Sequence, residues 1–560
     1  MQKSPFWRGC AAFVAVIALV LVGFPLAYAW THGVNPDAWP DPFEMNPGMW
    51  LSDLQSGSVL PIVITYWQMA HGTCDSLPGG GWQAGVTLLI IAIFLVAWIM
   101  VEGRREAPRN PSGAYGSTNW ATRKERRKLK MGIEIGLDPV DRRPVRIEVE
   151  KNLLTIAPPR TGKTAGFIIP NLAATDPGAW NGPAVVIDPK GDAYRAVRRR
   201  RLELGHTVHC LDPLGLVNGT DRWNPLAARD PDDVLYLQGM ARALLPNNLG
   251  TENAAFFTTS AVDLLVAAFT VTVTNGRATP TAAAQLLQNP KKLEAALENR
   301  DDPVSERALN LLRDDPKLRA NVVATAQQAT QWLCDARMRR IVDDHTFELS
   351  DLARGDVDLF IVLPDDDRKE ALAPFVRWLL ADLFTAARIN RLERRLLVII
   401  DEAKMLGRFE AVINGQGVLP GYGVSMWTIW QARSQLTDTY GAEGVRTFLQ
   451  NAEMINVFDI PRQDPDETEY WSRAIGEFTG VKATTSYDPK TGWPTTSVTS
   501  EAQRLIPATD IPNFLQHFQV AMLSGEGYTR NPLKLRRTKA FKDPRFAGLV
   551  DSTPPVLRSR

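Results

Sequence analysis

The most apolar parts of the chain are two runs near its N-terminus, at residues 11–29 and 86–101. Each run is close to the length that spans a bilayer as a helix. Basic residues precede the first run and follow the second, whereas residues 31–85 contain neither lysine nor arginine. Because basic residues stay on the cytoplasmic side, the pattern predicts a two-pass anchor over residues 1–103 with both termini in the cytoplasm.

The first apolar run has an alternative interpretation as a secretory signal with a cleavage site at Ala27-Tyr28-Ala29. The run is longer than the apolar core of a usual signal, which favours a retained helix. With either interpretation, the second run leaves everything after it in the cytoplasm.

Beyond the anchor, short apolar runs alternate with longer segments of helical periodicity. Strands that alternate with helices form a parallel sheet covered by helices. The pattern therefore predicts an α/β fold over residues 131–226 and 345–560. The expected strands are residues 153–157, 184–188, 208–212, 358–364, 395–400 and 423–430, with 448–451 and 455–458 continuing the sheet.

Between residues 227 and 344 only helical periodicity remains, which predicts an all-α domain inserted into the sheet. Its charges nearly cancel, with 13 lysines and arginines against 15 acidic residues. A grip on a nucleic acid backbone would favour a basic surface. The near balance of positive and negative charges therefore favours a protein-docking or regulatory module. The prolines that punctuate its helices are Pro280, Pro290, Pro303 and Pro316.

Three further segments carry expectations of their own. Residues 104–130 end in a basic run, which predicts a juxtamembrane linker attracted to anionic lipid heads, with nucleic acid binding as the alternative. The polar tract 484–499 is expected to form a loop. A basic stretch near the C-terminus is expected to be a solvated tail, with contact to a substrate as the alternative; it contains Arg536, Arg537, Lys539 and Lys542.

Composition narrows the class of protein only slightly. The net charge is +1, so there is no overall polyelectrolyte signal for nucleic acid. The four cysteines lie far apart, which argues against a disulfide scaffold and against a zinc site; they are Cys10, Cys74, Cys210 and Cys334. At 560 residues the chain is long enough for several domains.

The first candidate for chemistry is a phosphate-binding loop between an expected strand and an expected helix. In such a loop, backbone N–H groups and the helix N-terminus surround phosphates. Lys163 would reach the outer phosphates, and the Thr164 hydroxyl would hold Mg²⁺. The usual pattern begins with glycine, but this loop begins with alanine, so a chance Gly-Lys-Thr in a surface turn is the alternative. The loop comprises Ala157, Pro158, Pro159, Arg160, Thr161, Gly162, Lys163 and Thr164.

Later strands supply the partners that such a loop needs. Residues 395–400 end in Asp401 and Glu402; Asp401 can take an outer-shell place on Mg²⁺, and Glu402 can polarise an attacking water. The strand that follows ends in Gln431, which either senses the γ-phosphate or is an amide at the edge of the core. Asp188 ends another strand, and ligands collect at such ends, so it faces the nucleotide or is an ordinary strand exit.

Taken in order, these motifs resemble the type IV secretion coupling proteins of the VirD4/TraG class. The resemblance runs from the membrane hairpin nearly to the C-terminus. The stretches that carry it are Gly116–Ala121, the phosphate-binding loop with Ile169–Leu172, Asp188–Gly191, Trp223–Pro225, Asp401–Gly407, Gly421–Gly423, Gln431, Glu467–Tyr470 and Leu505–Ile511.

The resemblance implies a RecA-like P-loop ATPase with an all-α insert, a two-helix transmembrane hairpin and a homo-hexameric ring in the bacterial inner membrane. It implies ATP and Mg²⁺ as cofactors. It also implies partners: the inner-membrane components of the secretion system, and relaxase–DNA complexes or effector proteins that dock through the all-α domain. Ring ATPases of this kind need an arginine from the neighbouring subunit. Residues 415–423 contain none, so Arg408, Arg433 and Arg446 are the candidates.

Two other hypotheses stay open at this point. The chain could be a pump for double-stranded DNA of the chromosome-segregation type, but we find only two membrane segments and no terminal DNA-reading module. It could also be mainly a docking receptor, with ATP used for assembly. The sequence does not distinguish DNA cargo from protein cargo.

Overall fold

The computed structural model describes residues 113–245, 252–487 and 494–551. Both predicted membrane helices, at 11–29 and 86–101, lie outside these residues, so the anchor stays a prediction. Within the described residues one helical segment, Ala255–Thr274, is long and apolar enough to cross a membrane, but 67% of it is buried in the protein. It is the central helix of the predicted all-α segment.

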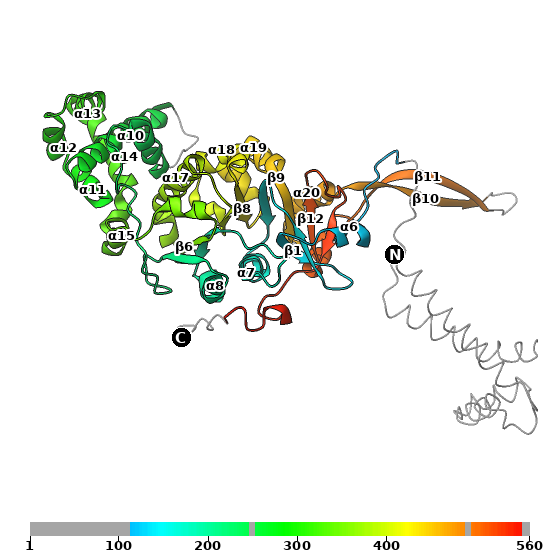
Figure 1. Cartoon of the computed structure of the whole chain (residues 1–560). Coiled ribbons are helices and arrows are strands. Elements are labelled where there is room, and N and C mark those ends of the chain that lie inside the picture. The colour runs from blue at the N-terminus through cyan, green and yellow to red at the C-terminus, as the bar shows by residue number, and fades with distance from the viewer. Residues whose placement is uncertain (1–112, 246–251, 488–493, 552–560) are drawn as a thin grey trace, which may run out of the picture. The chain divides into compact units, whose positions relative to one another are not determined.

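A nine-stranded sheet lies at the centre of the described α/β part (Figure 1). Its order is β13-β12-β9-β3-β8-β7-β4-β6-β5. The strands from β9 to β5 run parallel, and β12 and β13 add an antiparallel edge. The α/β prediction is confirmed, and the sheet is mixed but mostly parallel. The bounds are β3 Asn152–Ile156, β4 Ala184–Pro189, β5 Thr207–Leu211, β6 Val357–Leu363, β7 Leu396–Ile400, β8 Val424–Trp430, β9 Ala452–Phe458, β12 Gln519–Leu523 and β13 Leu533–Leu535.

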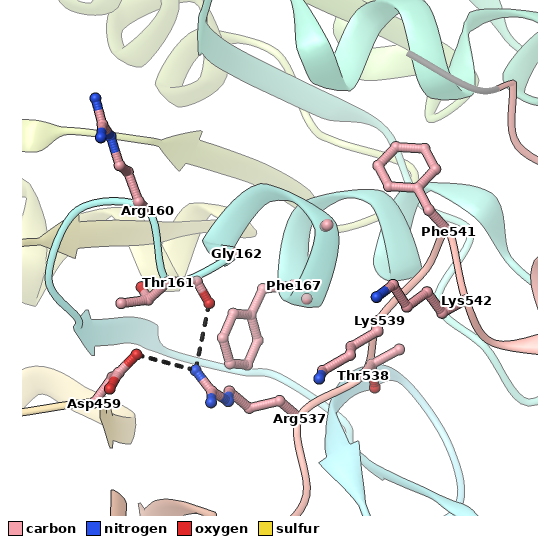
Figure 2. A pocket seen from close by; sticks show the side chains of 12 residues that line it. Arg160, Thr161, Gly162, Phe167, Asp459, Arg537, Thr538, Lys539, Phe541 and Lys542 are labelled. Atoms are coloured by element: carbon pink, nitrogen blue, oxygen red, sulfur yellow. Dashed lines mark hydrogen bonds and ion pairs between the residues drawn. The ribbon is translucent and has the colours of Figure 1, made fainter. Parts of the chain in front are cut away.

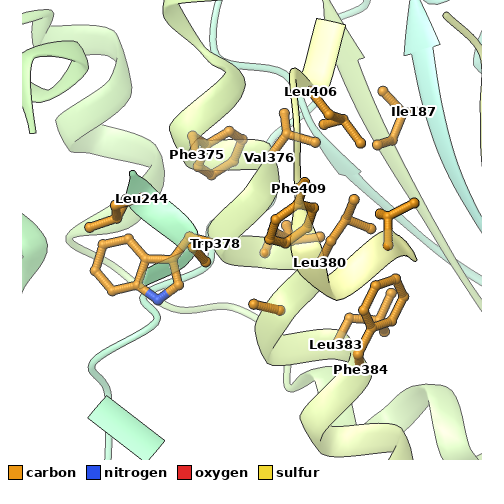
Figure 3. Close-up of a cluster of buried hydrophobic side chains, with 14 of the residues drawn as sticks. Ile187, Leu244, Phe375, Val376, Trp378, Leu380, Leu383, Phe384, Leu406 and Phe409 are labelled. Carbon is orange, nitrogen blue, oxygen red and sulfur yellow. The ribbon is translucent and has the colours of Figure 1, made fainter. Parts of the chain in front are cut away.

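Both faces of this sheet are covered, which explains why its strands are apolar without interruption. Alternate residues of β3 enter two separate hydrophobic clusters, Leu154 in one and Leu153 in the other. In Figure 3, Phe375, Trp378 and Phe384 of α17 belong to the first cluster. The helices on that face are α17 Ala373–Ile389, α18 Glu410–Val418 and α19 Arg433–Asn451, and those on the other face are α7 Ile169–Ala173 and α8 Asp192–Glu203 (Figure 1).

The described residues between 227 and 344 form helices and no strand, as the periodicity predicts. The prolines that punctuate this segment each occupy the first turn of a helix, where a missing N–H costs nothing. The helix before them, α10, packs against α9, α11, α13 and α14. The bounds are α9 Val234–Leu244, α10 Glu252–Thr274, α11 Pro280–Gln288, α12 Pro290–Leu297, α13 Pro303–Arg313, α14 Pro316–Ala329, η4 Gln331–Cys334 and α15 Ala336–Val342.

Two expectations about secondary structure are wrong. Residues 448–451 do not continue the sheet, because they are the last turn of α19, whose Phe448 packs in the core. The tract 484–499 is not a simple loop, because its described residues belong to a two-stranded sheet of β10 (Glu477–Tyr487) and β11 (Pro494–Arg504). Its six threonines favour an extended backbone, a preference that outweighs its polarity.

The predicted basic linker is partly folded. Residues 123–128 form α6, followed by the antiparallel pair β1 (Ile133–Leu137) and β2 (Pro144–Ile147). Arg126 of α6 is buried, and its Nε donates to Asp138 at 2.7 Å. Part of this basic run therefore makes an internal ion pair and is not free to contact lipid.

The basic C-terminal stretch is likewise not a solvated tail in its described part. Leu533–Leu535 form the edge strand β13, and Thr538, Ala540 and Phe546 are buried. The Ala540 N–H donates to the Ala165 carbonyl at 3.0 Å. The stretch is thereby fixed against the helix that follows the predicted phosphate-binding loop.

Candidate functional site

The predicted phosphate-binding loop joins the end of β3 to a wide helical turn. Gly162 has φ +81°, a backbone conformation that favours glycine. Thr164–Ile168 form a π-helix that continues into α7. Successive N–H groups are therefore grouped at the start of a helix, where anions bind.

Ala157 explains how the loop tolerates alanine in place of the usual first glycine. Its backbone does not adopt a positive φ, its side chain is completely buried, and its N–H donates to the Trp430 carbonyl at 2.9 Å. A methyl group at this position packs into the core and strains nothing. Alanine at this position is therefore compatible with a phosphate-binding loop.

Lys163 donates back to its own loop, and Thr164 connects the loop to the strand that ends in acidic residues. The Lys163 ammonium donates to the Ala157 and Pro158 carbonyls at 3.2 and 3.3 Å. The Thr164 hydroxyl donates to Asp401 Oδ2 at 3.1 Å. Burial raises the pKa of Asp401, and Lys163 opposes that rise. A hydroxyl and a carboxylate this close together are the hard oxygen ligands that Mg²⁺ prefers.

Glu402 is held in place by two further side chains. The backbone of Glu402 has φ +72°, which is rare for a residue other than glycine. Where such a conformation occurs, it is often at a functional site. Glu402 Oε1 accepts from Lys369 Nζ at 2.8 Å and from Gln431 Nε2 at 3.4 Å. Strand β8 lies between β3 and β7, with Ile156 level with Trp430. This register brings Gln431 between the loop and the acidic pair.

These groups surround one cavity of about 510 Å³. It combines backbone N–H groups, three lysines, two threonine hydroxyls, four carboxylates and an amide, a set suited to a polyphosphate and its metal ion. The structure thus brings together most of the residues predicted from sequence. Those that line the cavity are Pro159, Arg160, Thr161, Gly162, Lys163, Thr164, Asp401, Glu402 and Gln431.

Asp188 does not line this cavity, and the alternative of a strand exit describes it better. The carboxyl is buried, and its Oδ2 accepts from the Tyr194 N–H of α8 at 2.8 Å. Because the start of α8 presents unpaired N–H groups, it draws the side chain away from the cavity. Lys190, two residues later, lines the cavity and pairs with Asp365 at 2.7 Å.

The burial of Asp188 predicts a pH-dependent stability. Burial raises its pKa to about 7, against 3.8 for the free group. The stability that the protonated Asp188 contributes is fully present below pH 3.8 and is lost as the pH rises towards 7. In this pH range the unfolded chain has released the proton and the folded protein still holds it. Asp188→Asn keeps an acceptor for Tyr194 and cannot ionise. We expect it to raise the melting temperature by about 2–4 °C at pH 8 and by less at pH 5.

Thermal unfolding of the wild type and the variant at both pH values measures this effect. The exposed Asp232, replaced by asparagine, serves as control and should give no pH-dependent difference. An equal or smaller gain at pH 8 than at pH 5 would show that the carboxyl is already ionised in the folded protein.

The three arginine candidates all have partners within this chain, and none lines the cavity. Arg408 pairs with Glu410 at 2.8 Å, and the Arg433 guanidinium lies 4.1 Å from the centre of the Tyr470 ring. Arg446 pairs with Glu443 on the surface of α19, and its side chain is 67% exposed. Of the three, Arg446 is the one best placed to reach another molecule.

Several lining residues are missing from the sequence-based set, among them Lys190, Lys369, Asp365, Asp192 and Phe541. Lys369 and Asp365 follow β6 in the charged run 365–370. The position of this run after a buried parallel strand was a usable signal. Phe541 offered no such signal, because it reaches the site only through the folding of the C-terminal stretch.

A family profile described as "Type IV secretory system Conjugative DNA transfer" matches residues 138–554. The VirD4 protein of Rhizobium radiobacter is 26% identical over 411 residues, which cover 70% of this chain and 57% of that protein. The conjugal transfer protein TraG of Agrobacterium fabrum is 26% identical over 333 residues, which cover 57% of this chain and 49% of that protein. This chain therefore spans about half the length of these relatives.

A solved structure of plasmid coupling protein TrwB in complex with ADP and Mg²⁺ is similar in fold. Its TM-score is 0.59 at 17% identity, with 79% of this chain and 99% of that chain covered. The fold similarity agrees with the mostly parallel sheet and its helical covering. Because the family profile covers most of the chain, this protein belongs to the VirD4/TraG family of type IV secretion coupling proteins.

Proposed function

We propose that the chain is an inner-membrane coupling ATPase of a type IV secretion system. It recruits relaxase–DNA complexes or effector proteins and couples the binding and hydrolysis of ATP to their delivery to the channel. Membership of the coupling-protein family supports this function. The nucleotide complex of TrwB supports ATP and Mg²⁺ as the cofactors.

The observation that carries the proposal is the convergence of three strand ends on one cavity. In this proposal the loop 157–164 surrounds the phosphates, and Lys163 neutralises their outer charge. Thr164 and Asp401 would hold Mg²⁺, which would supply positive charge against the negative charge of the phosphates. Glu402 accepts a proton from the attacking water, and Gln431 lies within hydrogen-bond reach of Glu402.

The assembly we propose is a homo-hexamer that is anchored by the N-terminal hairpin. A ring places the cavity of one subunit against the surface of the next, so an arginine from the neighbour can reach the phosphates. The exposure of Arg446 makes it the preferred candidate, because an exposed ion pair such as Arg446–Glu443 costs little to break. In this arrangement the helices between 227 and 344 dock the cargo.

A transfer experiment tests the proposed function. In cells whose only copy carries Glu402→Gln, we expect the protein to stay in the inner-membrane fraction and transfer to fall to background. Conjugative DNA transfer and effector secretion are measured side by side, and the one that is lost identifies the cargo. Wild-type levels of both would contradict a coupling ATPase. The wild type, expressed at the same level, is the control for the amount of protein in the membrane fraction.

A further inference from the structure

A second cavity of about 410 Å³ adjoins the first at the phosphate-binding loop, and Figure 2 shows the residues that line it. The start of the loop's helix forms one wall, and the C-terminal stretch forms the other. The two cavities share lining residues, so a single elongated ligand can occupy both. The shared residues are Arg160, Thr161, Gly162, Ala165 and Phe541.

The C-terminal wall of this cavity is fixed by several hydrogen bonds. Arg537 donates to the Thr161 carbonyl and to Asp459, both at 3.4 Å (Figure 2). It also donates to the Gln516 carbonyl at 2.7 Å. The Thr538 hydroxyl donates to Glu134 Oε1 at 2.7 Å. A wall held from both sides is preorganised for a ligand.

The orientation of a nucleotide in the first cavity determines which part of it reaches the second cavity. Glu402 and Lys369 mark the end where the outer phosphate belongs, and Ala165 and Phe541 lie where the cavities join. A nucleoside triphosphate with its outer phosphate at Glu402 extends its ribose and base away from that end. The size of the second cavity falls within the range of small-ligand sites, about 300–1,000 Å³.

Phe541 offers the chemistry that a base requires. Its side chain is 46% exposed, unusual for a phenylalanine beside a buried wall. No aromatic ring among the described residues packs against it, whereas Phe167 in the same cavity already contacts Trp427 and Phe458. An uncovered ring face is a stacking surface for a base.

We infer that the second cavity binds the nucleoside part of the nucleotide, with the ring of Phe541 as the surface against which the base stacks. This inference rests on the proposed function, because it assumes a nucleotide in the first cavity. It assigns the C-terminal stretch to ligand binding. The competing occupant is a second anion, because Lys539 and Lys542 also line the cavity.

Calorimetric titration of the full-length chain in detergent separates the two occupants. Mg-ATP and Mg-tripolyphosphate are the two probes, since only ATP carries a base. We expect Phe541→Ala to weaken ATP binding about tenfold and to leave tripolyphosphate binding unchanged. Phe541→Trp keeps a stacking surface and should retain the affinity for ATP. Phe256→Ala, at an exposed phenylalanine in α10, is the matched control and should change neither affinity.

Unchanged binding of both ligands by Phe541→Ala would overturn the inference. Equal weakening of both would also overturn it, because it would mean that the cavity holds an anion or supports the loop. Failure of the unsubstituted chain to bind ATP would contradict the proposed function itself, a result that is distinct from the other two. Retained tripolyphosphate binding by the variant shows that its loop is folded.

Discussion

Replacement of Glu402 by glutamine is expected to lower the rate of ATP hydrolysis by about 10²–10⁴-fold. The amide has the size of the carboxyl and can still occupy the position beside Gln431. It cannot accept a proton from the attacking water. Glu402 also accepts from Lys369 at 2.8 Å, so its orientation is fixed before substrate arrives. The loss should therefore appear in kcat, while the affinity for ATP changes little.

Steady-state turnover at saturating ATP, together with a direct binding titration, measures both quantities. Glu203→Gln on α8 is the control, because Glu203 is half exposed and pairs with Arg199 at the surface. A kcat for Glu402→Gln close to that of the wild type would remove Glu402 from the reaction. A large change in affinity would mean that it binds the nucleotide and does not act on water.

Replacement of Lys163 by alanine is expected to weaken ATP binding by about 10–100-fold, because each charge-assisted hydrogen bond is worth about 1.5–3 kcal/mol. The loss has a second component. Burial raises the pKa of Asp401 and Lys163 opposes it, so the variant should raise that pKa further. A protonated carboxyl is a poor ligand for Mg²⁺. Part of the affinity should therefore return as the pH increases.

The measurement is the dissociation constant for Mg-ATP at about pH 6 and about pH 8, roughly one unit either side of neutrality. Lys404→Ala is the matched control, since Lys404 follows Asp401 closely and is exposed. An affinity equal to that of the wild type would show that Lys163 does not contact phosphate. An equal loss of affinity at both pH values would show that the substitution does not act through the pKa of Asp401.

The centre of the site could be predicted because each of its residues carries a local signal. Lys163 and Thr164 follow a buried strand and begin a helix, while Asp401 and Gln431 each follow another buried strand. The carboxyl ends of parallel strands lie along one edge, so finding the strands places the residues. Strand order is not a local property, and no signal in the chain predicts that β8 lies between β3 and β7.

The residues that were missed or misplaced depend on contacts between distant segments. Asp188 has the same strand-end signal as Asp401, but the first turn of α8 captures its carboxyl. Lys369 lies in a run of six charged residues, and only the packing of that run selects the one that reaches Glu402. Arg537 was expected in a solvated tail. Its contacts with Thr161 and Asp459 span 376 and 78 positions of the chain, and composition alone does not predict them.

At Ala157 the usual sequence pattern demands glycine although the backbone conformation does not require it. The first glycine of the usual motif is needed where the backbone has a positive φ or another group approaches closely. At Ala157 neither condition holds, and the methyl group is buried in the core. In this loop the conformational freedom of glycine is required at Gly162, where φ is +81°.

The central claim is that the cavity between β3, β8 and β7 binds Mg-ATP and hydrolyses it. Its most direct test is ATP turnover by the full-length chain, with and without Mg²⁺, for the wild type, Lys163→Ala and Glu402→Gln in parallel. We predict Mg²⁺-dependent turnover by the wild type, loss of both turnover and tight binding in Lys163→Ala, and loss of turnover alone in Glu402→Gln. Turnover that persists in both variants would contradict the claim.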